Sequence, residues 1–86
     1  MGHTVYILRT SSNTLYIGQT NNLEKRLKEH KDKNSKSAKY MRYFKSFKLV
    51  YRETHPTLSK AMRREIGLKK LSHKQKEMLI NGILQR

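Results

Sequence analysis

Two short runs of β-branched and aromatic residues near the N-terminus constrain this chain more than any other feature. Residues 4–10 read TVYILRT and residues 14–20 read TLYIGQT, and Ser11, Ser12 and Asn13 separate them. Two such runs joined by three turn residues predict a β-hairpin. Because a chain of 86 residues needs nearly every apolar residue for its core, this hairpin has to contribute to that core.

The segment after the hairpin predicts an amphipathic helix. Asn21 is expected to cap its N-terminus, with Glu24 three residues later as in a capping box, and the helix should end near Lys31. Spacings of three and four residues place a set of side chains on one face of this helix. The set consists of Leu23, Arg26, Leu27 and His30.

The middle of the chain predicts a loop, a short helix and a third strand. Residues 32–37 form the loop, and aromatic residues at helical spacing predict the short helix from Ala38. Alternation in residues 47–54 predicts a half-buried strand, which His55-Pro56 ends. The residues expected on its buried face are Phe47, Leu49 and Tyr51.

Two further helices follow. Thr57 should cap a helix that runs to about Leu71, and Ser72 with Gln75 predicts a capping box for a last helix through about Asn81. The residues expected on the inner face of the first are Leu58, Ala61, Met62, Glu65 and Leu68. The order of elements indicates one α+β domain over residues 1–86, with a three-stranded antiparallel sheet flanked by helices.

The charge balance points to a polyanionic partner. Twenty Lys and Arg residues against six Asp and Glu residues give a net charge of +14. This excess predicts strong, salt-dependent binding of nucleic acid. The alternative is a solvated basic surface with the tyrosines in the core. The residues expected to contact nucleic acid are Lys36, Lys39, Tyr40, Arg42, Arg63, Lys69 and Lys70.

Composition also excludes several classes of protein. No stretch approaches the roughly 18 apolar residues of a membrane span, and no early run resembles a signal peptide. With no Cys, disulfides, thiolate zinc sites and cysteine nucleophiles are excluded, and we expect an intracellular, cytoplasmic location.

Three polar residues occupy positions where the helical patterns call for apolar ones. Arg26, His30 and Glu65 are costly on an inward face unless they are paired. One alternative is a structural Arg–Glu salt bridge, with His30 bonded to a backbone carbonyl. The other is a phosphodiester site, in which a carboxylate holds Mg²⁺ and an arginine neutralises phosphate.

The hairpin adds Tyr6 and Tyr16, which share strand parity and so can lie on one face of a regular hairpin. A tyrosine can act as a general base if nearby cations lower its pKa. The alternative is an ordinary pair of core side chains.

These motifs together resemble the GIY-YIG endonuclease superfamily. The resemblance spans residues 4 to about 71 and rests on Tyr6, on Tyr16-Ile17-Gly18, on residues 22–30 (NLEKRLKEH) and on Arg63-Arg64-Glu65. The chain looks most like small stand-alone bacterial members, which are similar to the catalytic domain of Slx-type nucleases. Two departures stand out: the first motif reads Thr4-Val5-Tyr6 without its glycine, and Gln19 follows the second-motif glycine.

The resemblance implies a metal-dependent, structure-selective endonuclease of DNA repair or recombination, with Mg²⁺ or Mn²⁺ as cofactor. It implies a monomer whose partners are DNA and a targeting protein. The competing reading is a non-catalytic nucleic-acid-binding module on the same fold. The catalytic residues that it implies are Tyr6, Tyr16, Arg26, His30 and Glu65, with Glu65 as the metal ligand.

Overall fold

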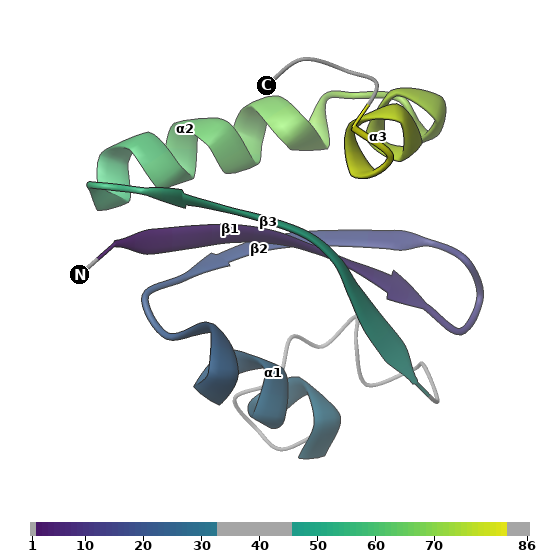
Figure 1. The fold of residues 1–86 in the computed structure, drawn as a ribbon, viewed down its shortest axis with the longest axis horizontal. Coiled ribbons are helices and arrows are strands. Elements are labelled where there is room, and N and C mark those ends of the chain that lie inside the picture. The colour runs from purple at the N-terminus through teal and green to yellow at the C-terminus, as the bar shows by residue number, and fades with distance from the viewer. Residues whose placement is uncertain (1, 33–45, 83–86) are drawn as a thin grey trace.

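A computed structural model describes residues 2–32 and 46–82. Its strands are β1 (His3–Thr10), β2 (Leu15–Thr20) and β3 (Phe47–His55), and its helices are α1 (Leu23–Asp32), α2 (Leu58–Lys69) and α3 (His73–Ile80). The strands form one antiparallel sheet in the order β2-β1-β3, so that β1 is central. Helices α2 and α3 cover one face and α1 covers the other (Figure 1). The predicted α+β architecture is therefore confirmed.

Alternation along β1 divides the apolar residues between the two faces of the sheet. Val5 and Ile7 belong to the cluster that also contains buried residues of α2 and α3. Tyr6 and Leu8 belong to a second cluster, which is packed by partly buried residues of α1. Because successive side chains of a strand point to opposite faces, the central strand supplies both cores.

A β-bulge changes the predicted pattern of the third strand. Ile7 lies opposite Tyr51 while Leu8 lies opposite Leu49, so Val50 is an extra residue on β3. The prediction of one buried face was therefore wrong. Leu49 packs with Phe47 in the Tyr6 cluster, whereas Tyr51 is buried with Ile7 on the opposite face.

The hairpin and the caps of the two later helices agree with the sequence patterns. The Asn13 N–H donates to the Thr10 carbonyl, and Asn13 closes the turn with a φ of 63°. Thr57 caps α2, and Ser72 forms the predicted capping box with Gln75.

The first helix begins one residue later than predicted. The Asn22 side chain, and not that of Asn21, accepts the Lys25 N–H at 3.2 Å. The Asn22 carbonyl also accepts the first helical hydrogen bond, from Arg26. Asn22 therefore has the role of N-cap residue.

Helix α2 buries a narrower stripe than predicted, and it ends at Lys69, before Leu71. Ala61 and Leu68 are its buried residues. Three apolar side chains at a spacing of four residues are instead exposed; they are Leu58 (46%), Met62 (46%) and Ile66 (54%). The predicted inner positions of Leu58 and Met62 were therefore wrong, because the side of α2 that is buried is the one that carries Ala61 and Leu68.

Part of the predicted loop and the short helix predicted from Ala38 fall in residues 33–45, outside the described residues. None of the helices that the structure describes has the length and apolar character needed to cross a bilayer.

The glycine of β2 allows a close approach between the two strands of the hairpin. Gly18 lies opposite Tyr6 in the antiparallel ladder. A Cβ atom at Gly18 would lie 2.7 Å from the Tyr6 hydroxyl oxygen and 2.8 Å from its ring carbon Cζ. Real Cβ contacts are essentially never below 3.0 Å. Glycine is therefore required here for the Tyr6 ring to lie across β2.

Replacing Gly18 with Ala should lower the free energy of unfolding by about 1–3 kcal/mol, the usual cost of forcing a methyl group into a packed site. Gly67 provides the matched control, because a Cβ there has nothing within 4 Å. Gly67→Ala should stabilise α2 by about 0.5–1 kcal/mol. Urea unfolding of both variants would test the pair, and a Gly18→Ala variant as stable as the parent would contradict the packing argument.

Candidate active site

A buried tyrosine and a buried histidine meet between the sheet and α1. Tyr6 leaves β1 toward α1, and its hydroxyl oxygen lies 3.2 Å from Nε2 of His30. Both side chains are almost fully buried, at 1% exposure each. Nε2 of His30 thus has the Tyr6 hydroxyl as a hydrogen-bond partner.

Two more aromatic rings enclose this pair. The Tyr16 ring on β2 lies 6.4 Å from that of Tyr6 and 5.6 Å from that of His30, measured between centroids. The Phe47 ring on β3 lies 6.1 Å from that of His30, nearly perpendicular to it. All three strands therefore contribute a ring to the pocket that fixes the imidazole, as such edge-to-face arrangements favour.

Arg26, which lies one turn before His30 on α1, adds a positive charge to this pocket. Its guanidinium lies close enough to the Tyr6 hydroxyl to lower the pKa of Tyr6 by hydrogen bonding and by its charge. Its Nη1 atom also donates to Oε1 of Glu29 at 3.3 Å. The Arg26 side chain is 27% exposed, so it links the buried tyrosine to the surface.

The surroundings of Tyr6 hold its hydroxyl in the protonated form. Burial, followed by the charge of a neighbouring ionised Tyr16, raises the pKa of Tyr6 to about 12. The hydrogen bond and positive charge of Arg26 lower this pKa, but they do not outweigh burial. At neutral pH Tyr6 is therefore a neutral hydroxyl that can both donate and accept a hydrogen bond.

The surroundings of His30 favour its neutral form. Burial and then the charge of Arg26 lower the pKa of His30, and the charge of Glu29 opposes them only in part. A neutral imidazole carries one N–H and one lone pair. His30 can therefore accept a proton from Tyr6, provided that the hydrogen of the ring lies on Nδ1.

Glu65 approaches the site from the other face of the sheet. It lies on α2, beside the buried Ala61–Leu68 stripe, and its Oε2 pairs with Nζ of Lys69 at 3.0 Å. The charge of Glu65 contributes to the raised pKa of Tyr6, so the carboxylate is within electrostatic range of the hydroxyl. The alternative of an Arg26–Glu65 salt bridge was wrong, because each residue has a different ion-pair partner.

The donor groups of the described residues suit a divalent metal ion that takes few protein ligands. Among residues 2–32 and 46–82, no three His, Asp or Glu side chains come together as ligands. Glu65 is partly exposed, at 21%, and its ion pair engages only Oε2. Since Mg²⁺ uses one or two protein carboxylates together with water and phosphate, a single exposed carboxylate suits it.

A second polar cluster, which the sequence patterns did not indicate, joins α2 to β3. Glu53 accepts hydrogen bonds from the Tyr51 hydroxyl at 2.5 Å and from Nε of Arg64 at 2.6 Å, and it lies 2.8 Å from Nε2 of His55. Burial alone would raise the pKa of Glu53, but these partners outweigh it and hold that pKa below its usual value. The alternation of residues 51, 53 and 55 was the available signal.

This cluster fixes the rotation of α2. With 100° between successive helix residues, Arg64 and Glu65 lie on opposite sides of the Ala61–Leu68 stripe. Because Arg64 is bonded to Glu53 on β3, Glu65 has to project on the other flank.

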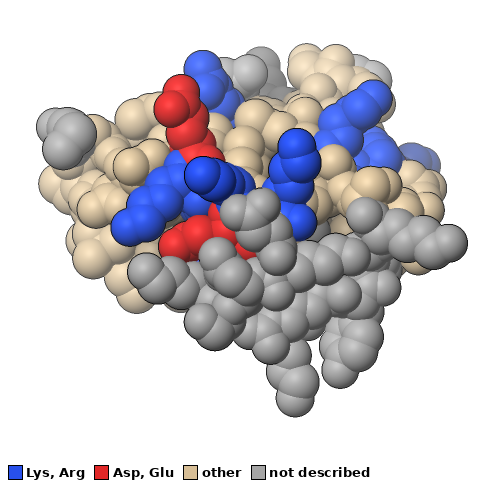
Figure 2. Space-filling view, turned by 90° about the horizontal axis from the view of Figure 1, so that it is seen from below, with Lys and Arg blue, Asp and Glu red and all other residues tan. Residues whose placement is uncertain are grey.

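The predicted nucleic-acid contacts are only partly described. Arg63, Lys69 and Lys70 are exposed on α2 or directly after it. The others lie outside the described residues; they are Lys36, Lys39, Tyr40 and Arg42. Figure 2 views the α1 side, where Lys and Arg spread across the described surface and acidic side chains occupy one part of it.

Comparison with known proteins agrees with this geometry. A family model described as the GIY-YIG catalytic domain matches residues 2–78. A UPF0213 protein of Bacillus licheniformis is 47% identical over 78 residues, which cover 91% of this chain and 78% of that protein. A UPF0213 protein of Clostridium perfringens is also 47% identical over 78 residues, covering 91% and 82%.

Two solved structures have the same fold. The solution NMR structure of the UPF0213 protein BH0048 from Bacillus halodurans has a TM-score of 0.60 at 38% identity, covering 94% of this chain and 84% of that one. The solution NMR structure of the protein EF2693 from E. faecalis has a TM-score of 0.65 at 30% identity, covering 100% and 91%. The matched segment holds the Tyr6–His30 pair, Arg26 and Glu65, and the chain belongs to the GIY-YIG family, among the small UPF0213 proteins.

Proposed function

We propose that this chain is an endonuclease that hydrolyses DNA phosphodiester bonds with the help of one Mg²⁺ or Mn²⁺ ion. The observation that carries the proposal is the buried Tyr6 hydroxyl, which is hydrogen-bonded to His30 and whose pKa is affected by both Arg26 and Glu65. Family membership supports nuclease chemistry. The expected role in repair or recombination rests on the resemblance to Slx-type nucleases.

Glu65 would hold the metal ion through one carboxylate oxygen, and water and substrate phosphate would complete the coordination. When bound, such an ion supplies Lewis-acid stabilisation of the phosphate and of the leaving oxygen. In the structure Lys69 neutralises this carboxylate, so the Lys69 ammonium has to move away from Glu65 when the ion binds.

Arg26 would neutralise charge that develops on the phosphate. A guanidinium carries five N–H donors in a planar fork that matches phosphate oxygens. Its contacts with Tyr6 and Glu29 orient this fork at the mouth of the buried pocket. An oriented cation stabilises a transition state more than a mobile one because it needs no reorganisation.

The proton of the attacking water would leave through a relay. Tyr6 is protonated, so its oxygen can take the proton of water only if its own proton moves on. Nε2 of neutral His30 lies 3.2 Å away and accepts it, so that no free phenolate is needed. Tyr16 packs against both rings and holds them in place.

A non-catalytic nucleic-acid-binding module is the second candidate. The raised pKa of Tyr6 favours it, because an isolated tyrosine of this kind is a poor base. In that case the exposed cations of α2 would bind DNA, and the Tyr6–His30 pair would only be part of the core.

The metal role of Glu65 can be tested with Glu65→Gln, which keeps the shape and removes the charge. We expect loss of Mg²⁺-dependent cleavage, with DNA affinity unchanged or higher. Because the lost ion pair with Lys69 is an i,i+4 surface pair, stability should fall by only about 0.3–0.5 kcal/mol. Cleavage assays with branched, flapped and single-stranded DNA, in Mg²⁺ or EDTA, measure the first effect, and thermal melts measure the second.

Glu77→Gln provides the matched control. It also removes an acidic ion-pair partner, here that of Arg9, but it lies on α3 far along the chain from the Tyr6 pocket. This variant should cleave like the parent. A Glu65→Gln variant with normal activity would exclude Glu65 as the essential metal ligand.

The relay can be tested with Tyr6→Phe, which keeps the packing and removes the hydroxyl. Single-turnover cleavage with saturating protein should slow by about 10²–10⁴, the usual contribution of proton transfer to a positioned group. Tyr51→Phe is the control, since it removes a hydroxyl on the opposite face that bonds Glu53. A Tyr6→Phe rate within about threefold of the parent would rule out the relay.

The pH dependence separates the relay from a phenolate base. Because the pKa of His30 is lowered, its neutral form is complete at neutral pH and is lost as the pH falls through that pKa. The single-turnover rate should therefore be level from about pH 7 to 9 and fall on the acid side. A phenolate with the pKa of about 12 would instead give a tenfold rise per pH unit across that range. His30→Gln should abolish the acid limb.

A further inference from the structure

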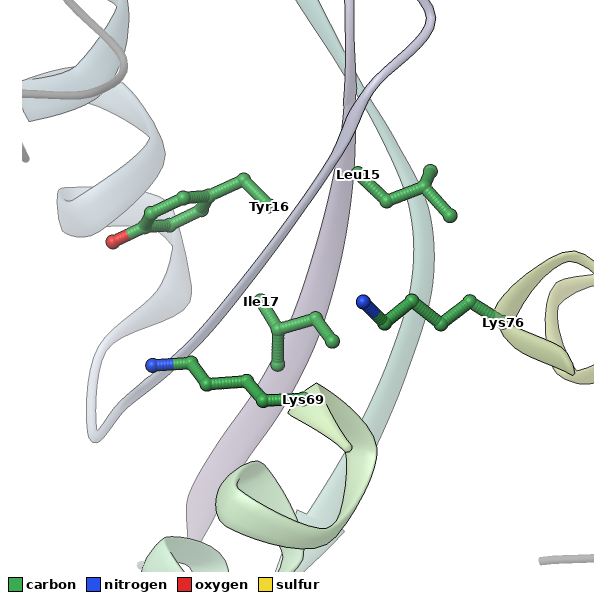
Figure 3. Close-up of a pocket in the computed structure, with 5 residues that line it drawn as sticks. All are labelled: Leu15, Tyr16, Ile17, Lys69 and Lys76. Atoms are coloured by element: carbon green, nitrogen blue, oxygen red, sulfur yellow. The ribbon is translucent and has the colours of Figure 1, made fainter. Parts of the chain in front are cut away.

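A groove runs along the outer edge of β2, on the flank where Glu65 projects. Five residues from three elements line it, and they are Leu15, Tyr16, Ile17, Lys69 and Lys76. Its volume is about 360 Å³. Figure 3 shows Lys76 reaching from α3 toward β2, while Lys69 extends from the end of α2 past Ile17 in the same direction as the Tyr16 side chain.

The lining of the groove selects an anion with an apolar body. Among the described residues that line it, the charged side chains are the two lysines; the apolar Ile17 side chain lies between them, and Leu15 lies on the far side of Lys76 (Figure 3). Lys69 pairs with Glu65 at 3.0 Å. Within residues 2–32 and 46–82, Lys76 has no acidic partner, although it is partly buried. An ammonium without an acidic partner beside an apolar lining is what an anionic ligand can satisfy.

The size of the groove limits what the anion can be. Sites for small molecules are usually about 300–1,000 Å³, so this groove is at the low end of that range. One phosphate with its sugar fits such a space, whereas the surface of a duplex is too broad to enter it. The occupant would therefore be a nucleotide that is not held in a base pair.

The groove is continuous with the candidate active site. Tyr16 lines the groove, and its ring also packs against Tyr6 and His30. Lys69 likewise lines the groove and pairs with Glu65, the proposed metal ligand. A strand that enters the groove thus reaches the reacting groups without crossing the sheet.

We propose that this groove binds the phosphate and sugar of one unpaired nucleotide next to the bond that is cleaved. The inference rests on the proposed function, and it names the substrate class: DNA with a single-stranded segment at the cleavage point. Lys76 is the residue specific to this groove, and Lys69 serves both the groove and Glu65.

The test compares two alanine variants that remove the same charge from the same helix. Lys76 lines the groove, whereas Lys74 is exposed two residues away and does not line it. Binding of each variant to two fluorescent DNAs would be measured in EDTA, where no cleavage occurs. One DNA is a blunt duplex, and the other is the same duplex with an unpaired tail.

Lys76→Ala should weaken binding of the tailed DNA by about tenfold, as loss of a charge-assisted hydrogen bond predicts, and leave blunt-duplex binding nearly unchanged. The slope of log affinity against log salt should become shallower by about 0.7 on the tail, the value for one single-strand phosphate. Lys74→Ala should affect both DNAs equally and weakly. Lys76→Arg, which keeps the charge, should restore binding of the tailed DNA, and the blunt-duplex binding that Lys76→Ala retains would show that the alanine variant is folded.

Equal losses in Lys74→Ala and Lys76→Ala would overturn the proposal, because only general electrostatics would then be acting. A loss for Lys76→Ala that is the same on blunt and tailed DNA would also overturn it. An inactive protein with the predicted binding pattern would refute the nuclease assignment and keep the groove. An active nuclease in which Lys76→Ala does not change DNA binding would refute the groove and keep the nuclease assignment.

Discussion

The Tyr6 ring lies across Gly18 with no room for a side chain between them, and the candidate site depends on this contact. This contact directs the Tyr6 hydroxyl, on the central strand β1, toward α1, where it lies 3.2 Å from Nε2 of His30. Any larger residue at Gly18 would displace the ring and take the hydroxyl away from Nε2 of the buried imidazole, which is costly in a low-dielectric interior. The second-motif glycine is therefore a packing requirement of the tyrosine on the neighbouring strand. The missing glycine of the first motif has no such role here, because Thr4 lies opposite Thr20, two residues further along the ladder.

The two faces of the sheet carry different parts of the candidate site, and these parts come together at the β2 edge. The α1 face carries the aromatic pocket, and the α2 face carries the carboxylate. The Glu53–Arg64 pair holds α2 against β3 and so turns Glu65 toward β2. Because β2 is an outer strand, side chains from both faces can reach around it. A site built at the edge of a small sheet needs no deep cavity, which suits a chain with so few apolar residues.

Local patterns predicted much of this fold and the members of the site. The hairpin and the Ser72–Gln75 capping box depend on neighbouring residues only, and His30 and Arg26 stood out as polar residues on an apolar stripe. Features set by tertiary contact were missed. Because Val50 is an extra residue, Leu49 and Tyr51 point to opposite faces of the sheet, and this bulge arises from the pairing of β3 with β1. The exposure of Met62 depends on how α2 is rotated, which the long-range bond between Arg64 and Glu53 decides.

The protonation states of Tyr6 and His30 depend on burial and on neighbouring charges, and a bound substrate would change those charges. Burial keeps the proton on Tyr6 and off His30, so the two groups form a donor and an acceptor without a charge between them. Glu65 favours the protonated tyrosine, whereas Arg26 opposes it. A cation on Glu65 would cancel its effect, and a phosphate on Arg26 would cancel the opposing one. Arg26 affects the pKa of Tyr6 more strongly than Glu65 does, so the arrival of both would leave Tyr6 protonated. A proton relay, which passes a proton from the attacking water through Tyr6 to His30, suits a protonated tyrosine better than a mechanism that needs a stable phenolate.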